Sequence, residues 1–221
     1  MSVWYCIPSA RHPHEANAVL AAWRAQGYKL AVFHDYEAEP VIADHIIYGA
    51  YVGYAAAVNA LASFVLSEDP GAEWIVTGGD DLYPDETHPA DEIAAICRGH
   101  FNGTFGVMQP TGDAYGALAN DTAAVSPWMG REWCRRINGG RGPLWPEYPH
   151  YYVDAELMDV ASRHGVMLRI DDLTQYHDHY LRDGRANCPE HLKRWQTTNE
   201  ASRMLYERRK SAGFPGSEPL P

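Results

Sequence analysis

Apolar and polar residues follow one another along the first part of the chain in the order that an α/β domain requires. A β-rich apolar run at residues 3–7 stops at Pro8 and predicts a buried first strand. Residues 13–27 then carry apolar side chains at helical spacing, between an opening proline and a closing glycine. A second apolar run at residues 28–33 leads into Asp35. This order predicts two parallel strands joined by a right-handed helical crossover.

The middle of the chain continues the pattern. Residues 46–66 repeat apolar side chains at helical spacing, which predicts one long and mostly buried helix. A short apolar strand is expected at residues 74–76, then a helix that begins at Pro89, then a strand at residues 105–108. These segments predict further strands and helices of the same sheet.

The second half of the chain is richer in glycine, proline and aromatic residues. We expect residues 109–150 to form long loops over one face of the sheet, where binding groups commonly lie. A helix at residues 154–164 and a strand at residues 166–170 follow. The sequence therefore predicts one α/β domain over residues 1–213, with a mostly parallel central sheet flanked by helices, and a disordered tail at residues 214–221.

Composition and charge limit what this domain can be. Of the 221 residues, 46% are hydrophobic and 21% are charged, which is typical of a globular chain. The net charge of −11 argues against a dedicated nucleic-acid binder, and we interpret the basic residues at 131–141 and 193–210 as solvated helix faces. Four separated cysteines without a CxxC pair predict free thiols. We expect a cytoplasmic protein without signal peptide or membrane span, in the host cytoplasm if a phage encodes it.

The first candidate for chemistry follows the strand at residues 74–76. Gly78 and Gly79 let the backbone approach a ligand closely, and Asp80 and Asp81 supply oxygen ligands of the kind that Mg²⁺ or Mn²⁺ prefers. The carboxyl edge of an open α/β sheet is also where ligands bind. An ordinary turn with solvated aspartates explains the same residues, so both interpretations stay open for this motif alone.

Two further groups carry titratable side chains. His177 and His179 are alternate residues of an extended segment, so both imidazoles could face one metal ion. Asp154 and Glu156 stand at the start of the predicted helix at residues 154–164, where a carboxylate could accept a proton from an attacking hydroxyl. Taken alone, a polar strand end and an acidic helix N-terminus explain these groups more simply.

In this order the motifs resemble those of GT-A glycosyltransferases, over roughly the first 180 residues. The resemblance implies a Rossmann-like GT-A domain and a nucleotide-diphosphate-sugar donor, with a UDP-sugar expected. The positions that would bind the nucleotide follow the first strand, the second strand and the acidic turn: Pro8, Ser9, Ala10, Arg11, Asp35, Gly79 and Asp80.

The resemblance also implies a divalent metal ion, Mn²⁺ or Mg²⁺. Asp80, Asp81 and His177 would hold this ion, with His179 as the second choice for the histidine. The ion would act as a Lewis acid on the departing diphosphate. The chain departs from the family pattern at Gly78, which stands where the first Asp of a DxD motif is found.

A general base for inverting transfer is implied at Asp154, in an acidic motif that also contains Glu156. Val153 stands where the family often has Glu, which is a second departure from its pattern. The segment in the place of the acceptor loop contains three aromatic side chains that could stack on a sugar or a base: Trp128, Trp145 and Tyr148.

The donor sugar, the acceptor and the oligomeric state stay open, and a modified phage DNA base is one acceptor that we consider. If Asp154 only positions the acceptor, a retaining route also stays open. A nucleotidyltransferase or sugar-phosphate pyrophosphorylase shares the sheet order and the metal, but residues 8–15 contain none of the glycines of its phosphate loop. The same motifs are also compatible with a metal-dependent phosphoesterase and with a non-catalytic nucleotide-binding module.

Overall fold

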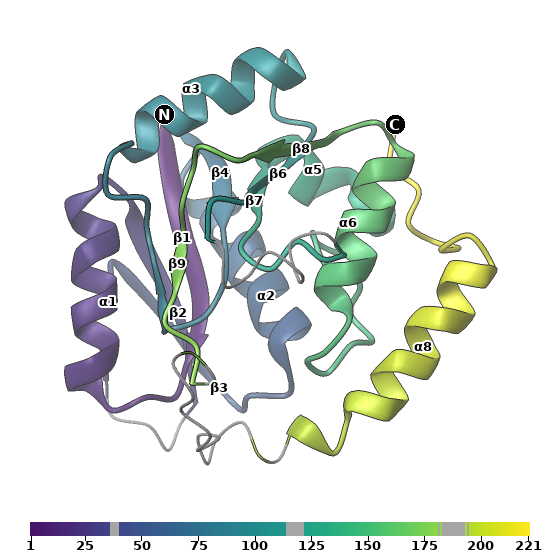
Figure 1. Ribbon diagram of the computed structural model, residues 1–221, viewed down its shortest axis with the longest axis horizontal. Coiled ribbons are helices and arrows are strands. Elements are labelled where there is room, and N and C mark those ends of the chain that lie inside the picture. The colour runs from purple at the N-terminus through teal and green to yellow at the C-terminus, as the bar shows by residue number, and fades with distance from the viewer. Residues whose placement is uncertain (36–39, 114–121, 181, 183–192, 194) are drawn as a thin grey trace.

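A seven-stranded sheet forms the centre of the computed structural model, which describes residues 1–35, 40–113, 122–180, 182, 193 and 195–221 (Figure 1). Its strands are β1 (Ser2–Ser9), β2 (Lys29–Asp35), β3 (His45–Gly49), β4 (Ala72–Val76), β6 (Val107–Pro110), β7 (Trp128–Gly130) and β8 (Met167–Ile170). They lie in the order β3-β2-β1-β4-β7-β6-β8. Only β7 is antiparallel to its neighbours, so the predicted mostly parallel sheet is confirmed.

Helices cover both faces of this sheet (Figure 1). One face carries α1 (Pro13–Ala25) and α3 (Ala90–Phe101), and the other carries α2 (Tyr54–Glu68), α5 (Arg131–Arg136) and α6 (Val153–Arg163). The 3₁₀ helix η2 (Ile137–Gly140) follows α5, and α8 (Asn199–Ser211) contacts α6. The fold is thus α/β, as expected. No helix in the described ranges is long and apolar enough to cross a membrane.

The first strand shows how the sequence builds a core on each face. Val3, Tyr5 and Ile7 pack with α1 and α3, whereas Trp4 and Cys6 pack with α2. Successive side chains of a strand point to opposite faces, so a strand covered on both sides needs an unbroken apolar run. Each large apolar side chain that is fully buried contributes about 1.5–3 kcal/mol to folding.

The prediction of one helix over residues 46–66 is wrong at its start. Residues 45–49 form the edge strand β3, and α2 begins only at Tyr54. Gly53 lies between them with a φ of +139°, and a Cβ at this position would lie 2.5 Å from the carbonyl oxygen of Pro149. A short apolar run fits either period, which is why the pattern alone did not separate this strand from the helix that follows.

The long-loop prediction for residues 109–150 is wrong in part. Residues 128–140 form β7, α5 and η2, and β7 is inserted between β4 and β6. A strand of three residues is too short for its period to be recognised in the sequence. Residues 114–121 of this stretch lie outside the described residues.

The segment after α8 is packed against the domain, in contrast to the disordered tail expected at residues 214–221. Phe214 is buried in the core beneath α2, α5 and α6. The amide of Leu220 donates to the carbonyl oxygen of Arg136 at 2.8 Å. One buried aromatic residue among glycines and prolines therefore anchors a segment whose composition is typical of a mobile end.

Arg203 and Lys210 of α8 are paired with acidic side chains. Arg203 bridges Glu200 and Glu207, and Lys210 Nζ lies 2.9 Å from Asp159 Oδ2. These charges are balanced within the molecule, so α8 offers less attraction to a polyanion than its sequence indicates.

A buried ion pair joins α8 to α6. Arg209 donates from Nε to Glu156 Oε2 and from Nη2 to Glu156 Oε1, both at 2.8 Å, and the two side chains are 7% and 3% exposed. The hydroxyl of Tyr148 donates to the same carboxylate at 2.8 Å, and the guanidinium lies over the Trp145 ring. Both ions lose their hydration, and this bidentate geometry compensates for the loss.

We expect Arg209→Ala to destabilise the protein by about 3–5 kcal/mol, because it leaves the Glu156 carboxylate buried without its partner. Urea unfolding measures this change. Arg203→Ala is the matched control, since it removes an arginine of the same helix from exposed pairs, and we expect little change there. Equal effects of the two substitutions would contradict the importance of the buried pair.

Candidate functional site

A pocket of about 550 Å³ opens at the carboxyl ends of β1, β2 and β4, and small-molecule sites are usually about 300–1,000 Å³. The first strand continues through its predicted stop to Ser9, so its end forms one wall. Parallel strands bring their carboxyl ends to one edge, which gathers distant residues here. We call this cavity the strand-end pocket. Most predicted site residues line it: Pro8, Ser9, Ala10, Asp35, Gly79, Asp80, Asp81, Asp154, His177 and His179.

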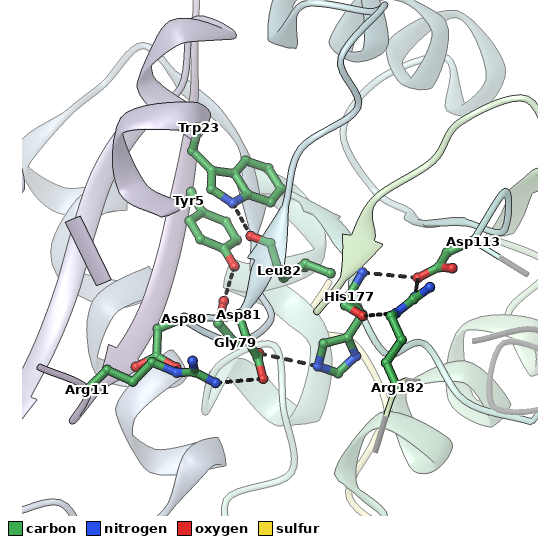
Figure 2. A network of polar contacts seen from close by, with 10 residues as sticks. All are labelled: Tyr5, Arg11, Trp23, Gly79, Asp80, Asp81, Leu82, Asp113, His177 and Arg182. Atoms are coloured by element: carbon green, nitrogen blue, oxygen red, sulfur yellow. Dashed lines mark hydrogen bonds and ion pairs between the residues drawn. The ribbon is translucent and has the colours of Figure 1, made fainter. Parts of the chain in front are cut away.

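The turn after β4 is held from inside the domain (Figure 2). The Tyr5 hydroxyl donates to the carbonyl oxygen of Gly79 at 2.6 Å, and Trp23 Nε1 donates to the carbonyl oxygen of Leu82 at 2.6 Å. A Cβ at Gly78 would collide with the Leu82 side chain and lie 3.4 Å from the Tyr5 hydroxyl. A side chain at Gly78 would therefore require the Leu82 side chain to move.

Arg11, which Figure 2 shows beside Asp80 and Asp81, and Ser9 hold the two carboxylates of this turn. Arg11 donates from Nε to Asp80 Oδ1 at 2.8 Å and from Nη2 to Asp81 Oδ2 at 3.1 Å. The Ser9 hydroxyl donates to Asp80 Oδ2 at 2.8 Å. Both aspartates are less than 10% exposed, so these bonds compensate for lost hydration. Arg11 is thus placed beside the pocket lining, bound to the acidic residues.

A two-residue ladder brings His177 to the acidic turn. The strand β5 (Leu82–Tyr83) pairs antiparallel with β9 (Tyr176–His177), and the amide of Asp178 donates to the Asp81 carbonyl oxygen at 2.8 Å. His177 Nε2 consequently lies 3.3 Å from Asp81 Oδ1. Burial by itself raises the pKa of Asp81, but the hydrogen bond and charge of His177 and the charge of Arg11 outweigh it, so the pKa is lowered.

Asp113 and Arg182 hold the backbone of His177 on its other side (Figure 2). Asp113 Oδ2 accepts from the His177 amide at 3.0 Å and from Arg182 Nη2 at 2.6 Å, while Arg182 Nε donates to the His177 carbonyl oxygen at 2.9 Å. These two residues were not predicted from the sequence. Neither belongs to a recognisable motif, and Asp113, which is 64 positions away in the sequence, reaches His177 only through the fold.

The described residues do not form a ready metal site. Within the described part of the chain, no group of three or more His, Cys, Asp or Glu side chains surrounds one point. Asp81 and His177 are close enough to share a ligand, but the oxygens of Asp80 already accept from Ser9 and Arg11. The predicted metal set is therefore gathered in one pocket without the arrangement that would hold an ion.

Asp154 lies at the N-terminus of α6 and lines the strand-end pocket. Its Oδ1 accepts from the amide of Ala155 at 3.0 Å, and its own carbonyl oxygen accepts from the amide of Ala124. Burial raises the pKa of the Asp154 carboxyl and outweighs the backbone hydrogen bonds that oppose this shift. A carboxylate with a raised pKa in a pocket is a stronger proton acceptor than an ordinary aspartate.

Four residues that were expected at the site lie elsewhere. Glu156 is occupied by Arg209 in the buried ion pair and does not line the strand-end pocket. The aromatic residues expected to stack on a ligand are buried in the core instead, because their rings fill space between the sheet and the helices: Trp128, Trp145 and Tyr148.

A different set of aromatic rings lines the pocket. Tyr51 and His150 contact Trp195, with ring centroids 5.3 Å and 6.2 Å away, and Tyr54 lies edge-on to His150 at 6.1 Å. We call Tyr51, Tyr54, His150 and Trp195 the aromatic wall. It was not predicted from the sequence, because aromatic residues are frequent in this chain and only their common position distinguishes these four.

Fold and pocket together define an α/β protein with a pocket at the carboxyl edge of its sheet. No protein-family model matches the sequence, and no curated protein matches it either. Comparison with solved structures does give matches.

Two of these structures are of β1,4-galactosyltransferase 7 from Drosophila, each 14% identical with a TM-score of 0.47. One is a mutant in complex with manganese, UDP-Gal and xylobiose, and the match covers 90% of this chain and 81% of that one. The other is the catalytic domain with xylobiose, with 91% and 79% covered. A Bacillus anthracis protein described as a glucose-1-phosphate thymidylyltransferase, with sucrose, is 10% identical with a TM-score of 0.47, with 91% and 96% covered.

We expect Asp154→Asn to stabilise the protein near neutral pH. A raised pKa means that Asp154 favours folding below the ordinary aspartate pKa of about 3.9, and that this contribution is lost as pH rises through the folded-state value. Asparagine keeps the oxygen that accepts from Ala155 and carries no charge. Urea unfolding of both proteins between pH 4 and pH 8 should give a difference that grows with pH. A less stable variant at neutral pH would contradict the raised pKa of Asp154.

Proposed function

We propose that this protein transfers a sugar from a nucleotide-diphosphate donor to an acceptor hydroxyl. The observation that carries this proposal is the position of Asp154. Its carboxylate faces the same pocket as the ends of β1, β2 and β4, the edge at which α/β sheets bind their ligands. A proton acceptor with a raised pKa beside such a site suits the activation of a hydroxyl.

The nucleotide would lie along the ends of β1 and β2. Pro8, Ser9 and Ala10 would contact the diphosphate and ribose. Asp35 would accept hydrogen bonds from the hydroxyl groups of the ribose or from the base. Phe33 lines the same side and offers an apolar surface to the base. The turn at Gly79 would face the diphosphate, because the glycine lets the backbone approach it closely.

In the transfer step, the acceptor oxygen attacks the anomeric carbon as its proton passes to a carboxylate oxygen of Asp154. The bond between the anomeric carbon and the diphosphate oxygen breaks, and the nucleoside diphosphate leaves with the electron pair. Attack opposite the leaving group inverts the configuration at the anomeric carbon. Asp154 then releases its proton to solvent, which restores the carboxylate.

The charge of the pocket favours a requirement for a cation. The lining carries Asp35, Asp80, Asp81 and Asp154, and no lysine or arginine is found among its described residues. Arg11 beside the lining compensates only part of this negative charge, so an anionic diphosphate would still be repelled unless further positive charge entered with it. Mn²⁺ or Mg²⁺ therefore remains a prediction, and Asp80, Asp81, His177 and His179 are the residues that would have to rearrange to hold it.

The acceptor would lie against the aromatic wall, which shares the pocket with Asp154. Aromatic faces bind rings that have an apolar face, as sugars and bases do. We therefore propose an acceptor whose hydroxyl belongs to, or is attached to, such a ring. Sugars and modified bases of phage DNA both meet this description.

We expect one nucleoside diphosphate, with UDP as the first choice, to stabilise the protein against heat when Mn²⁺ is present. A ligand at 100 times its dissociation constant adds about 2.7 kcal/mol, which raises Tm by about 5–10 °C for a chain of this size. Thermal unfolding with a panel of nucleoside diphosphates, with and without Mn²⁺, measures this shift.

Asp81→Ala should abolish the shift, and Asp172→Ala, which removes an exposed carboxylate outside the pocket, should leave it unchanged. If no nucleotide changes Tm in the native protein, the donor site is absent and the transferase proposal fails.

We further expect Asp154→Ala to lower kcat for consumption of the donor sugar by about 10²–10⁴-fold, because it removes the general base. The affinity for the nucleoside diphosphate should change little, since Asp154 contacts the acceptor and not the nucleotide. The assay follows the released product, which also distinguishes sugar transfer from nucleotidyl transfer. Release of pyrophosphate in place of a nucleoside diphosphate would indicate a nucleotidyltransferase, and an unchanged kcat would remove Asp154 from the mechanism.

A further inference from the structure

The acidic turn already holds a cation, the guanidinium of Arg11. It lies 2.8 Å from Asp80 Oδ1 and 3.1 Å from Asp81 Oδ2, so one group bridges both carboxylates (Figure 2). Glu15 lies at 4.0 Å from its remaining nitrogen. Asp80 and Asp81 are protected from solvent, because each is less than 10% exposed as a whole residue and 11% exposed in its side chain.

This arrangement conflicts with the metal ion expected at the same residues. A divalent cation on Asp80 and Asp81 needs the oxygens that now accept from Arg11. A divalent ion and the Arg11 guanidinium would repel each other strongly if both contacted Asp80 and Asp81, and a guanidinium keeps its charge at every accessible pH. Arg11 therefore cannot remain where it is while a divalent ion binds both carboxylates.

We propose that Arg11 is an internal competitor for the cation site, which a divalent ion must displace. Arg11 belongs to the loop after β1, whose residues Pro8, Ser9 and Ala10 line the strand-end pocket. A guanidinium released from the turn has that pocket within reach of its long side chain, and it binds phosphate oxygens in bidentate fashion. The released Arg11 then binds the diphosphate of the donor. The binding of the diphosphate by Arg11 rests on the proposed function, whereas the competition between Arg11 and the ion does not.

Displacement makes the two ligands dependent on each other. The ion frees Arg11 for the diphosphate, and the diphosphate prevents Arg11 from returning to Asp80 and Asp81. Each ligand thus raises the affinity for the other by the same factor. With neither ligand present, Arg11 compensates one of the two negative charges of Asp80 and Asp81 and stabilises the turn.

The test compares binding of Mn²⁺ alone to the native protein and to Arg11→Ala, followed by the EPR signal of the free ion. We expect Arg11→Ala to bind Mn²⁺ about tenfold more tightly or better, because the ion no longer has to break charge-assisted hydrogen bonds. Arg11→Lys should fall between the two, since an ammonium group keeps the charge but cannot bridge the carboxylates as the planar guanidinium does.

Arg24→Ala is the matched control. It removes the same charge from an exposed pair with Asp44 and should leave the Mn²⁺ affinity unchanged. Circular dichroism establishes that each variant is folded, and Arg11→Lys supplies the comparison if Arg11→Ala does not fold.

A Mn²⁺ affinity that is unchanged or weaker in the Arg11 variants would overturn the competition and leave Arg11 as a structural brace of the turn. Calorimetry with UDP in the presence of saturating Mn²⁺ tests whether Arg11 binds the diphosphate. We expect UDP to bind at least about tenfold more weakly to Arg11→Ala than to the native protein. If Arg11→Ala binds Mn²⁺ more tightly but neither the native protein nor any variant binds UDP, the competition is supported and the proposed donor site is rejected.

Discussion

The candidate site depends on the short ladder between β5 and β9. This ladder joins Leu82 to His177, which are far apart in the sequence, and it sets the imidazole 3.3 Å from the Asp81 carboxylate. Two residue pairs are too few to be stable alone. Trp23 supports the ladder through the Leu82 carbonyl oxygen, and Asp113 supports it through the His177 amide. The geometry of the acidic turn therefore depends on a core helix on one side and a buried carboxylate on the other.

Charge is the second constraint on this site. The turn places two buried carboxylates next to each other, and such groups are costly unless cations or hydrogen bonds accompany them. Arg11, Ser9 and His177 fulfil this need from within the chain. A site whose carboxylates have partners within the chain is stable before any ligand arrives, but every incoming cation must then compete with an existing partner. Stability of the empty turn and affinity for a metal ion are thus opposed in this pocket.

The fold was largely predictable because its signals are long and repeated. Strong apolar periods defined β1, α1 and α6, and the position of the Gly-Gly-Asp-Asp turn after β4 followed from the carboxyl-edge rule. Short or ambiguous segments were not predictable. The residues of β3 fit a helical period as well as a strand, and β7 has only three residues. Asp113 and Tyr51 belong to the site only through contacts made in space, and no local pattern distinguishes them from other residues of their kind.

The two acidic residues at the start of α6 show why a motif alone cannot assign a role. Asp154 and Glu156 are two positions apart on a helix, which turns them about 200° away from each other. Asp154 consequently faces the pocket, and Glu156 faces α8 and is closed off by Arg209. Only one of them is available to a ligand. The other fixes α6 against α8, and so it positions the first turn of the helix, and with it Asp154, at the edge of the pocket.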